Sequence, residues 1–128
     1  MSSRVEAAIS AYSANRTESL LADLDKALVD GEFLVPVSAE VTEISPGRYD
    51  VPVICLKTNT GDGAIPAFTT IGSLLHWKPE GSKYTTLAGS ALIAMAENMT
   101  EISEILVNPG GTPRGTIPRV EFRRLLSL

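Results

Sequence analysis

The segment from Ala64 to Trp77 reads Ala-Ile-Pro-Ala-Phe-Thr-Thr-Ile-Gly-Ser-Leu-Leu-His-Trp and decides how the domain is built. Its first five residues are apolar and predict a buried strand, and the hydroxyl pair that follows predicts the start of a helix ending at Trp77. Thr69 or Thr70 can accept hydrogen bonds from the unpaired amides of the first helical turn. A strand followed directly by a capped helix indicates a domain in which helices pack on a sheet.

Two helices are predicted before the sheet begins, over residues 3–14 and 16–30. Both segments carry apolar residues at the three- and four-residue spacing of one helical face. Gly31 is expected to end the second helix in a left-handed conformation, which glycine tolerates. We therefore divide the single domain of 128 residues into a helical segment, 1–31, and a sheet-and-helix body, 32–128.

The body is predicted to be a mixed sheet flanked by helices, which makes the chain an α/β protein. Apolar runs predict strands over residues 33–37, 41–44, 51–57, 64–68 and 105–107. Helices are predicted over residues 70–77, from a cap at Thr86 to Met99, and over 119–126. Glycines in the segment 59–63 predict a hairpin between the third and fourth of these strands.

Composition and charge exclude several classes of function. The formal net charge of −4 argues against general nucleic-acid binding, which depends on neutralising phosphates. The sequence shows neither a signal-peptide pattern nor an apolar stretch long enough to span a membrane. Cys55 is the lone cysteine and lies in an apolar run, so we expect a buried thiol in a reducing compartment. Together these features predict a cytoplasmic protein without nucleic-acid or membrane partners.

Residues with catalytic or metal-binding chemistry are sparse. The single histidine, His76, has no second histidine or cysteine near it in sequence, so no zinc site and no other metal or cofactor is expected. No spacing of carboxylates singles out a general acid and base. The residues therefore lean against an enzyme without deciding the question.

The loop over residues 108–115 is the candidate ligand-binding segment, because it follows a predicted buried strand. Asn108, Gly110 and Gly111 offer polar side-chain and amide groups, and Arg114 and Arg119 add positive charge. That combination suits a phosphate or carboxylate. The alternative is that the loop is only a turn and that its arginines are solvated.

Tyr12 and Trp77 are the candidate residues for a protein interaction. Trp77 either covers the edge of the core or anchors a partner, since tryptophan is enriched in interface hot spots. Tyr12 belongs to a terminal helix whose narrow apolar face docks either on its own domain or on a second copy.

Several motifs occur in the order found in SseB-like proteins. These are Phe33-Leu34-Val35-Pro36-Val37, Ile65-Pro66-Ala67-Phe68-Thr69-Thr70, the Leu-Leu-x-Trp ending at Trp77, the small-residue helix 88–99, and Ile105-Leu106-Val107-Asn108-Pro109-Gly110. Over residues 20–127 the chain resembles the N-terminal domain of this enhanced-serine-sensitivity family, especially its short actinobacterial forms. The resemblance implies a cytoplasmic α/β domain and supplies no catalytic residues. Functions of the second domain of longer members do not carry over.

Two functional hypotheses follow from these observations. The first is a non-catalytic binding or interaction module that contacts another protein and is able to form a homo-oligomer. The second is a small-molecule or anion-binding protein, conceivably an enzyme, that uses the loop 108–115 and the C-terminal arginines. A concave pocket with convergent polar groups at the loop would favour the second, and an exposed apolar patch would favour the first.

Overall fold

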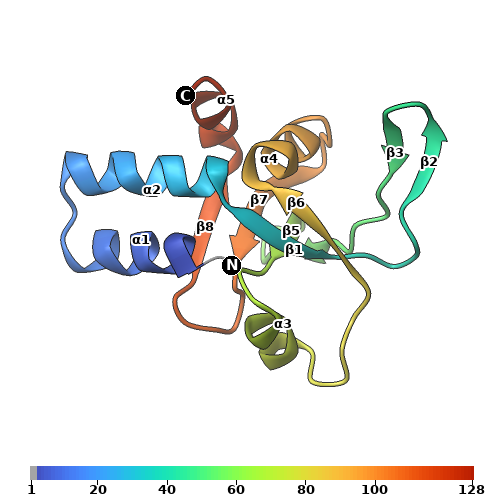
Figure 1. The fold of residues 1–128 in the computed structure, drawn as a ribbon, viewed down its shortest axis with the longest axis horizontal. Helices are drawn as coiled ribbons and strands as arrows, with labels where there is room; N and C mark the ends of the chain where they lie inside the picture. Colours follow the sequence, from blue (N-terminus) through green and yellow to red (C-terminus); the bar gives the residue numbers. More distant parts are fainter. Residues whose placement is uncertain (1–2) are drawn as a thin grey trace.

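The computed structural model describes residues 3–128, in which helices and short strands follow one another along the chain (Figure 1). The helices are α1 (Ser3–Ala14), α2 (Glu18–Asp30), α3 (Ile71–Trp77), α4 (Gly89–Glu97) and α5 (Phe122–Leu126), with a 3-10 turn, Arg119–Glu121, before α5. The strands are β1 (Glu32–Pro36), β2 (Thr42–Ser45), β3 (Arg48–Asp50), β4 (Leu56–Lys57), β5 (Gly63–Ala67), β6 (Tyr84–Ala88), β7 (Ile102–Val107) and β8 (Gly115–Pro118).

The strands form a four-stranded sheet and two pairs. The four-stranded sheet has the order β4-β5-β7-β8, in which β5 and β7 are parallel and the two edge strands are antiparallel to their neighbours. β1 pairs with β6, and β2 pairs with β3 in a hairpin that projects from the body (Figure 1). Leu34 and Phe68 exchange backbone hydrogen bonds of 2.8 Å, which join β1 to the end of β5. The fold is thus a single α+β domain of mixed sheets flanked by helices.

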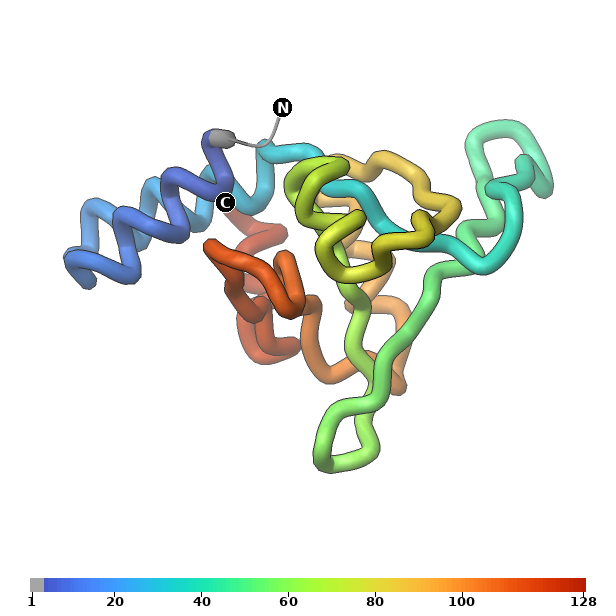
Figure 2. Tube along the Cα trace, turned by 90° about the horizontal axis from the view of Figure 1, so that it is seen from below, coloured from blue at the N-terminus to red at the C-terminus, as the bar shows by residue number. Residues whose placement is uncertain are grey.

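Helices α1 and α2 lie side by side and extend from the body on the side opposite the β2–β3 hairpin (Figures 1 and 2). Both predicted helices are confirmed. α2 begins at Glu18 rather than at residue 16, because Thr17 is its N-cap: Thr17 Oγ1 accepts a hydrogen bond from the Leu20 amide at 3.2 Å. The left-handed conformation predicted for Gly31 is wrong, because its φ is −72°. Glycine is required there by close packing instead: a Cβ would lie 2.5 Å from Cγ2 of Val5.

The N-terminus of α3 confirms the helix start predicted from the Ala64–Trp77 segment. Thr70 is the N-cap, its Oγ1 accepts from the Ser73 amide at 3.1 Å, and Ser73 Oγ accepts from the Thr70 amide at 3.1 Å. This reciprocal arrangement satisfies two amides at the start of the helix. Thr69, in contrast, is buried and bonds elsewhere.

Two predicted elements are wrong. Of the predicted strand 51–57, only β4 forms a ladder, because residues 52–54 bond to the end of β1 and the chain after it instead: the Ser38 amide donates to the Pro52 carbonyl and the Ile54 amide to the Pro36 carbonyl. Thr86 does not cap a helix but lies within β6, opposite Leu34.

Helix α4 begins at Gly89 without a side-chain cap, because packing sets its start. The Gly89 amide donates to the carbonyl of Gly31 at 2.7 Å, and a Cβ at Gly89 would overlap the carbonyl oxygen of Leu28. The first turn of α4 is therefore fixed against the end of α2 rather than by a capping residue.

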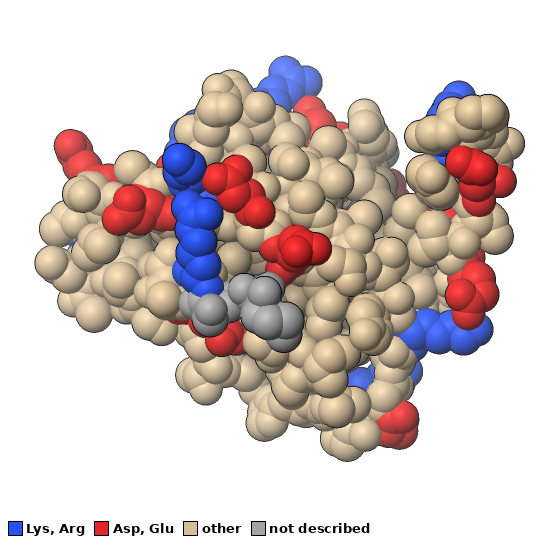
Figure 3. Space-filling model, viewed as in Figure 1, with Lys and Arg blue, Asp and Glu red and all other residues tan. Residues whose placement is uncertain are grey.

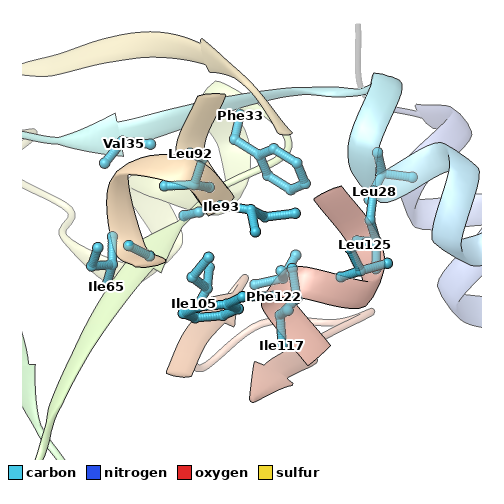
Figure 4. Packing of buried hydrophobic residues seen from close by; sticks show 14 of the residues in the cluster. Leu28, Phe33, Val35, Ile65, Leu92, Ile93, Ile105, Ile117, Phe122 and Leu125 are labelled. Carbon is cyan, nitrogen blue, oxygen red and sulfur yellow. The ribbon is translucent and has the colours of Figure 1, made fainter. Parts of the chain in front are cut away.

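The hydrophobic core lies between the helices and the β5–β7 pair (Figure 4). Phe33, Ile93 and Phe122 come from β1, α4 and α5 and are at most 1% exposed. Val5 and Ile9 of α1 belong to the same cluster, so the N-terminal helix docks on its own domain. Burying one large apolar side chain stabilises a fold by roughly 1.5 to 3 kcal/mol, so this cluster is the main stabilising element.

Charged residues are distributed over the surface, and the basic side chains are scattered in small groups among acidic ones on the face shown in Figure 3. A partly buried ion pair ties α5 to α2: Nη1 of Arg124 lies 2.6 Å from a carboxylate oxygen of Asp25. Hydrogen bonds to Asp25 and then to Glu121 raise the pKa of Arg124 above its ordinary value. Within residues 3–128, no helix is both long and apolar enough to cross a membrane.

Candidate functional site

The loop 108–115 is held from inside by a buried polar network. Asn108 is 1% exposed and has a φ of 53°. Its Oδ1 accepts from the Thr69 amide at 3.0 Å, and its Nδ2 donates to Thr69 Oγ1 at 2.9 Å and to the Pro113 carbonyl at 3.0 Å. Thr69 Oγ1 in turn donates to a carboxylate oxygen of Glu6 at 2.5 Å. The polar groups of Asn108 therefore close the loop onto β5 and α1.

A shallow depression of about 260 Å³ lies outside this network, between the loop and the start of α3. Its lining includes Glu6, His76 and Gly111. The amide of Gly111 donates to the carbonyl of Asn108 at 3.0 Å, and Nε2 of His76 lies 3.0 Å from the carbonyl of Gly110. This surface suits an anion poorly, because the Glu6 carboxylate repels negative charge and the Gly111 amide already donates to Asn108.

The two arginines predicted to assist the loop lie apart from it and from each other. Arg119 is half-buried, and its guanidinium donates to four backbone carbonyls, those of Ala96, Glu97, Met99 and Ile102, at distances from 2.5 to 3.2 Å. It closes the C-terminal end of α4, where carbonyls lack helical partners. Arg114 is exposed and lines a different depression, beside β8. The structure thus brings together only Asn108, Gly110 and Gly111 of the predicted binding set.

Cys55 is exposed, so the prediction of a buried core thiol is wrong. The residue lies just before β4, where the chain runs at the margin of the sheet instead of through it. Partial burial, and after it the nearby carboxylate of Glu101, raises the pKa of the thiol. A raised pKa leaves less thiolate at neutral pH, so Cys55 lacks the activation typical of a nucleophile. Among the described residues, no group of three or more histidine, cysteine or acidic side chains could hold a metal ion.

The two predicted interaction residues have different surroundings. Trp77 packs on the fully buried Phe68, with ring centroids 5.3 Å apart, and so covers the edge of the core. Tyr12 is half-buried on the α1 side facing β8, and the guanidinium of Arg16 lies 5.5 Å from the centroid of its ring. Tyr12 also lines a recess of the surface.

That recess, which we name the hairpin groove, runs between the α1–α2 pair and β8 with the turn after it. Two adjoining depressions of about 300 and 250 Å³ form it, and they share Tyr12, Leu24, Leu28, Thr116 and Ile117. Leu21 and Val120 extend the lining at one end, and Val120 is 84% exposed. The groove is mainly apolar, and Val120 is the most exposed of the large apolar side chains described.

The family comparison bears on all of these features. The model of the SseB protein N-terminal domain matches residues 5–123. The chain belongs to this family. The match confirms the resemblance noted in the sequence and extends it to α1, so that the loop 108–115 and the hairpin groove, apart from Arg124 and Leu125 in its lining, lie within the matched residues. Searches of curated proteins and of solved structures gave no match.

The apolar residues of the groove in this SseB domain were missed as a site by sequence reasoning. Leu21, Leu24 and Leu28 lie at the helical spacing of the apolar stripe on α2, but only Leu28 is buried. The strand β8 was not predicted, because it has four residues and ends in proline. The signal in the sequence is the apolar stripe of α2 itself, which carries Leu21 and Leu24 in addition to the buried Leu28.

Proposed function

We propose that this SseB domain is a non-catalytic binding module that recognises another protein through the hairpin groove. The observation that carries the proposal is the apolar recess itself, in which half-buried Tyr12, Leu21 and Leu24 face the almost fully exposed Val120. Exposed apolar surface beside a concave groove is typical of protein contacts. We place this role in the cytoplasm, where an accessible lone thiol such as Cys55 stays reduced.

The alternative of an anion-binding protein has weaker support. The depression at the loop 108–115 includes the carboxylate of Glu6, and Arg119 is engaged with carbonyls at the end of α4. Nucleic acid and membrane surfaces fit the groove poorly, because its lining is apolar and the chain carries a net charge of −4. A homo-oligomer remains compatible with the proposal when the partner is a second copy.

Affinity purification from native cell extract with a matched pair of variants tests the proposal. Val120→Asp places a charge on the exposed rim of the groove, and Ile44→Asp places the same charge on the exposed β2–β3 hairpin, where Ile44 is 64% exposed. We expect proteins captured by the wild type and by Ile44→Asp to be lost with Val120→Asp, as quantified by mass spectrometry.

Retention of every captured protein by Val120→Asp would contradict the proposal. Saturable binding of phosphate or small organic acids at the loop 108–115, monitored by amide chemical shifts at moderate salt, would favour the anion-binding alternative. Circular dichroism of both variants shows whether each keeps the wild-type fold.

A further inference from the structure

We propose that the occupant of the hairpin groove is an extended, mainly apolar segment of another protein, with a carboxylate at the end of the groove that Arg16 and Arg114 mark. This inference rests on the function proposed above and adds the chemistry of the partner. It follows from three features of the groove: its apolar lining, the strand edge along it and the charge at its ends.

The apolar lining of the groove is complementary to apolar side chains of a partner. Tyr12, Leu24, Leu28 and Ile117 line both depressions, so the apolar surface is continuous from one to the other. The recess is a groove rather than an enclosed cavity, and this shape suits a polypeptide segment better than a small molecule, which is usually enclosed on most of its surface.

The edge of β8 provides a place for an extended segment. β8 is the last strand of the order β4-β5-β7-β8, so one side of it has no neighbouring strand among the described residues. Thr116 and Ile117 point to opposite faces of the sheet, as successive residues of a strand do, yet both line the groove. The groove therefore runs along the strand edge, where an added strand can pair with the backbone. Pro118 ends this edge because it has no amide to donate.

The charges at the two ends of the groove differ. At the Val120 end, Asp25 and Glu121 pair with Arg124, each at 2.6 Å, so these charges satisfy one another. Arg16 and Arg114 line the opposite end, and neither forms an ion pair with any residue in the described part of the chain. The free positive charge of the groove is thus confined to one end, although the protein as a whole is acidic. Complementary charge selects a partner and fixes its direction in a groove.

The probe for this inference is a library of random 12-residue peptides displayed on phage and selected on the full chain. We expect the enriched peptides to be apolar with aspartate or glutamate near one end. One enriched peptide, synthesised with a fluorophore, should bind Arg16→Gln/Arg114→Gln roughly threefold to tenfold more weakly than the wild type in a polarisation titration. Arg48→Gln/Lys57→Gln changes the net charge equally at exposed positions away from the groove and should bind as the wild type does.

A second peptide, in which the acidic residue is replaced by its amide, completes the test. The amide peptide should bind the wild type as weakly as the acidic peptide binds Arg16→Gln/Arg114→Gln. Its affinity for Arg16→Gln/Arg114→Gln should be only slightly lower than its affinity for the wild type. Rising salt should weaken the acidic peptide more than the amide peptide. Val120→Asp should weaken both peptides.

Each other outcome overturns the inference in a recognisable way. Peptides that require Val120 but bind Arg16→Gln/Arg114→Gln normally would refute the carboxylate and leave the interaction module standing. A selection in which no enriched peptide depends on Val120 would overturn the module as well. Self-association of the wild type in sedimentation, lost in Val120→Asp, would make a second copy the occupant and refute the separate partner.

Discussion

At the scale of single residues, hydrogen bonding separates the polar side chains that hold the fold from those that are free to bind. Asn108 and Arg119 were both candidates for ligand binding, yet both are engaged with the backbone of the chain itself. Tyr12 and Arg114 keep accessible surface and lie on the same groove. The residue type marks all four side chains as candidates for binding. Their hydrogen-bond partners in the fold decide which of them hold the structure and which are free to bind.

Cys55 should react with a maleimide under native conditions, because its side chain is exposed. The reaction should be slower than with a free cysteine and should accelerate as pH rises, since partial burial and the Glu101 carboxylate raise the thiol pKa and so reduce the thiolate fraction. Glu101→Gln removes the second cause and should speed the native reaction at pH 7.5. Protection of Cys55 until the protein unfolds would restore the buried-thiol interpretation.

Asn108→Gly should lower the free energy of unfolding by about 2 to 3 kcal/mol, measured by urea denaturation. Glycine tolerates the φ of 53°, so the loss reflects the buried Thr69 amide and Pro113 carbonyl that are left without partners. Asn59→Gly, in the exposed turn after β4, is the matched control and should change stability by less than about 0.5 kcal/mol. Equal midpoints for the two variants would show that the network contributes nothing.

At the scale of secondary structure, the elements differ in what defines their ends. Local caps define α2 and α3, since Thr17 and Thr70 bond the amides of the helices that they precede. Packing defines α4, which has no side-chain cap and begins where Gly89 meets the end of α2. The opposite end of α4 is closed by Arg119, from the turn before α5.

Arg119→Lys should therefore destabilise the protein by about 2 kcal/mol in thermal or urea unfolding. A lysine ammonium cannot reproduce the fork of donors that reaches the carbonyls of Ala96, Glu97, Met99 and Ile102. Arg123→Lys, at a side chain that is 89% exposed, is the control and should be nearly neutral. A stability of Arg119→Lys equal to that of the wild type would refute its role as a helix-end clamp.

At the scale of the whole molecule, a compact body carries two projections on opposite sides (Figure 1). The α1–α2 pair is anchored to the body by Val5, Ile9 and Leu28, which belong to the core. The β2–β3 hairpin contributes no buried residue, and every position of its two strands is exposed. The first projection is part of the folding unit, whereas the second is an appendage to it.

Replacing residues 41–50 with Gly-Gly should therefore leave the free energy of unfolding within about 1 kcal/mol of the wild type. The amide of Ser38 donates to the carbonyl of Pro52 at 2.9 Å, so the base of the hairpin is already closed. Removing residues 3–16 is the contrasting variant and should unfold the protein, because it exposes the core around Ile9. Urea denaturation measures both, and collapse of the hairpin deletion would contradict this division.

The sequence by itself determined the helices, apart from the start of α4, and the central strands β5 and β7 with their sequential order. Their signals are local: apolar residues at helical spacing in α1 and α2, and the apolar run before Thr70 that forms β5. The turn over residues 59–63 was also predictable, because Gly61 has the positive φ of 89° that its sequence suggested. The family match covers residues 5–123, which contain these elements.

Only the tertiary structure decided which surfaces are buried and which groups meet. An apolar run predicts a strand but cannot show that residues 52–54 bond to the end of β1 and the chain after it, outside the four-stranded ladder, or that Cys55 is exposed. Nor can the sequence place Arg16 and Arg114, 98 positions apart, at one end of the same groove. Local patterns set the elements because they act between neighbouring residues, whereas burial and ion pairing depend on segments distant in the chain, whose approach is set by the packing of the whole core.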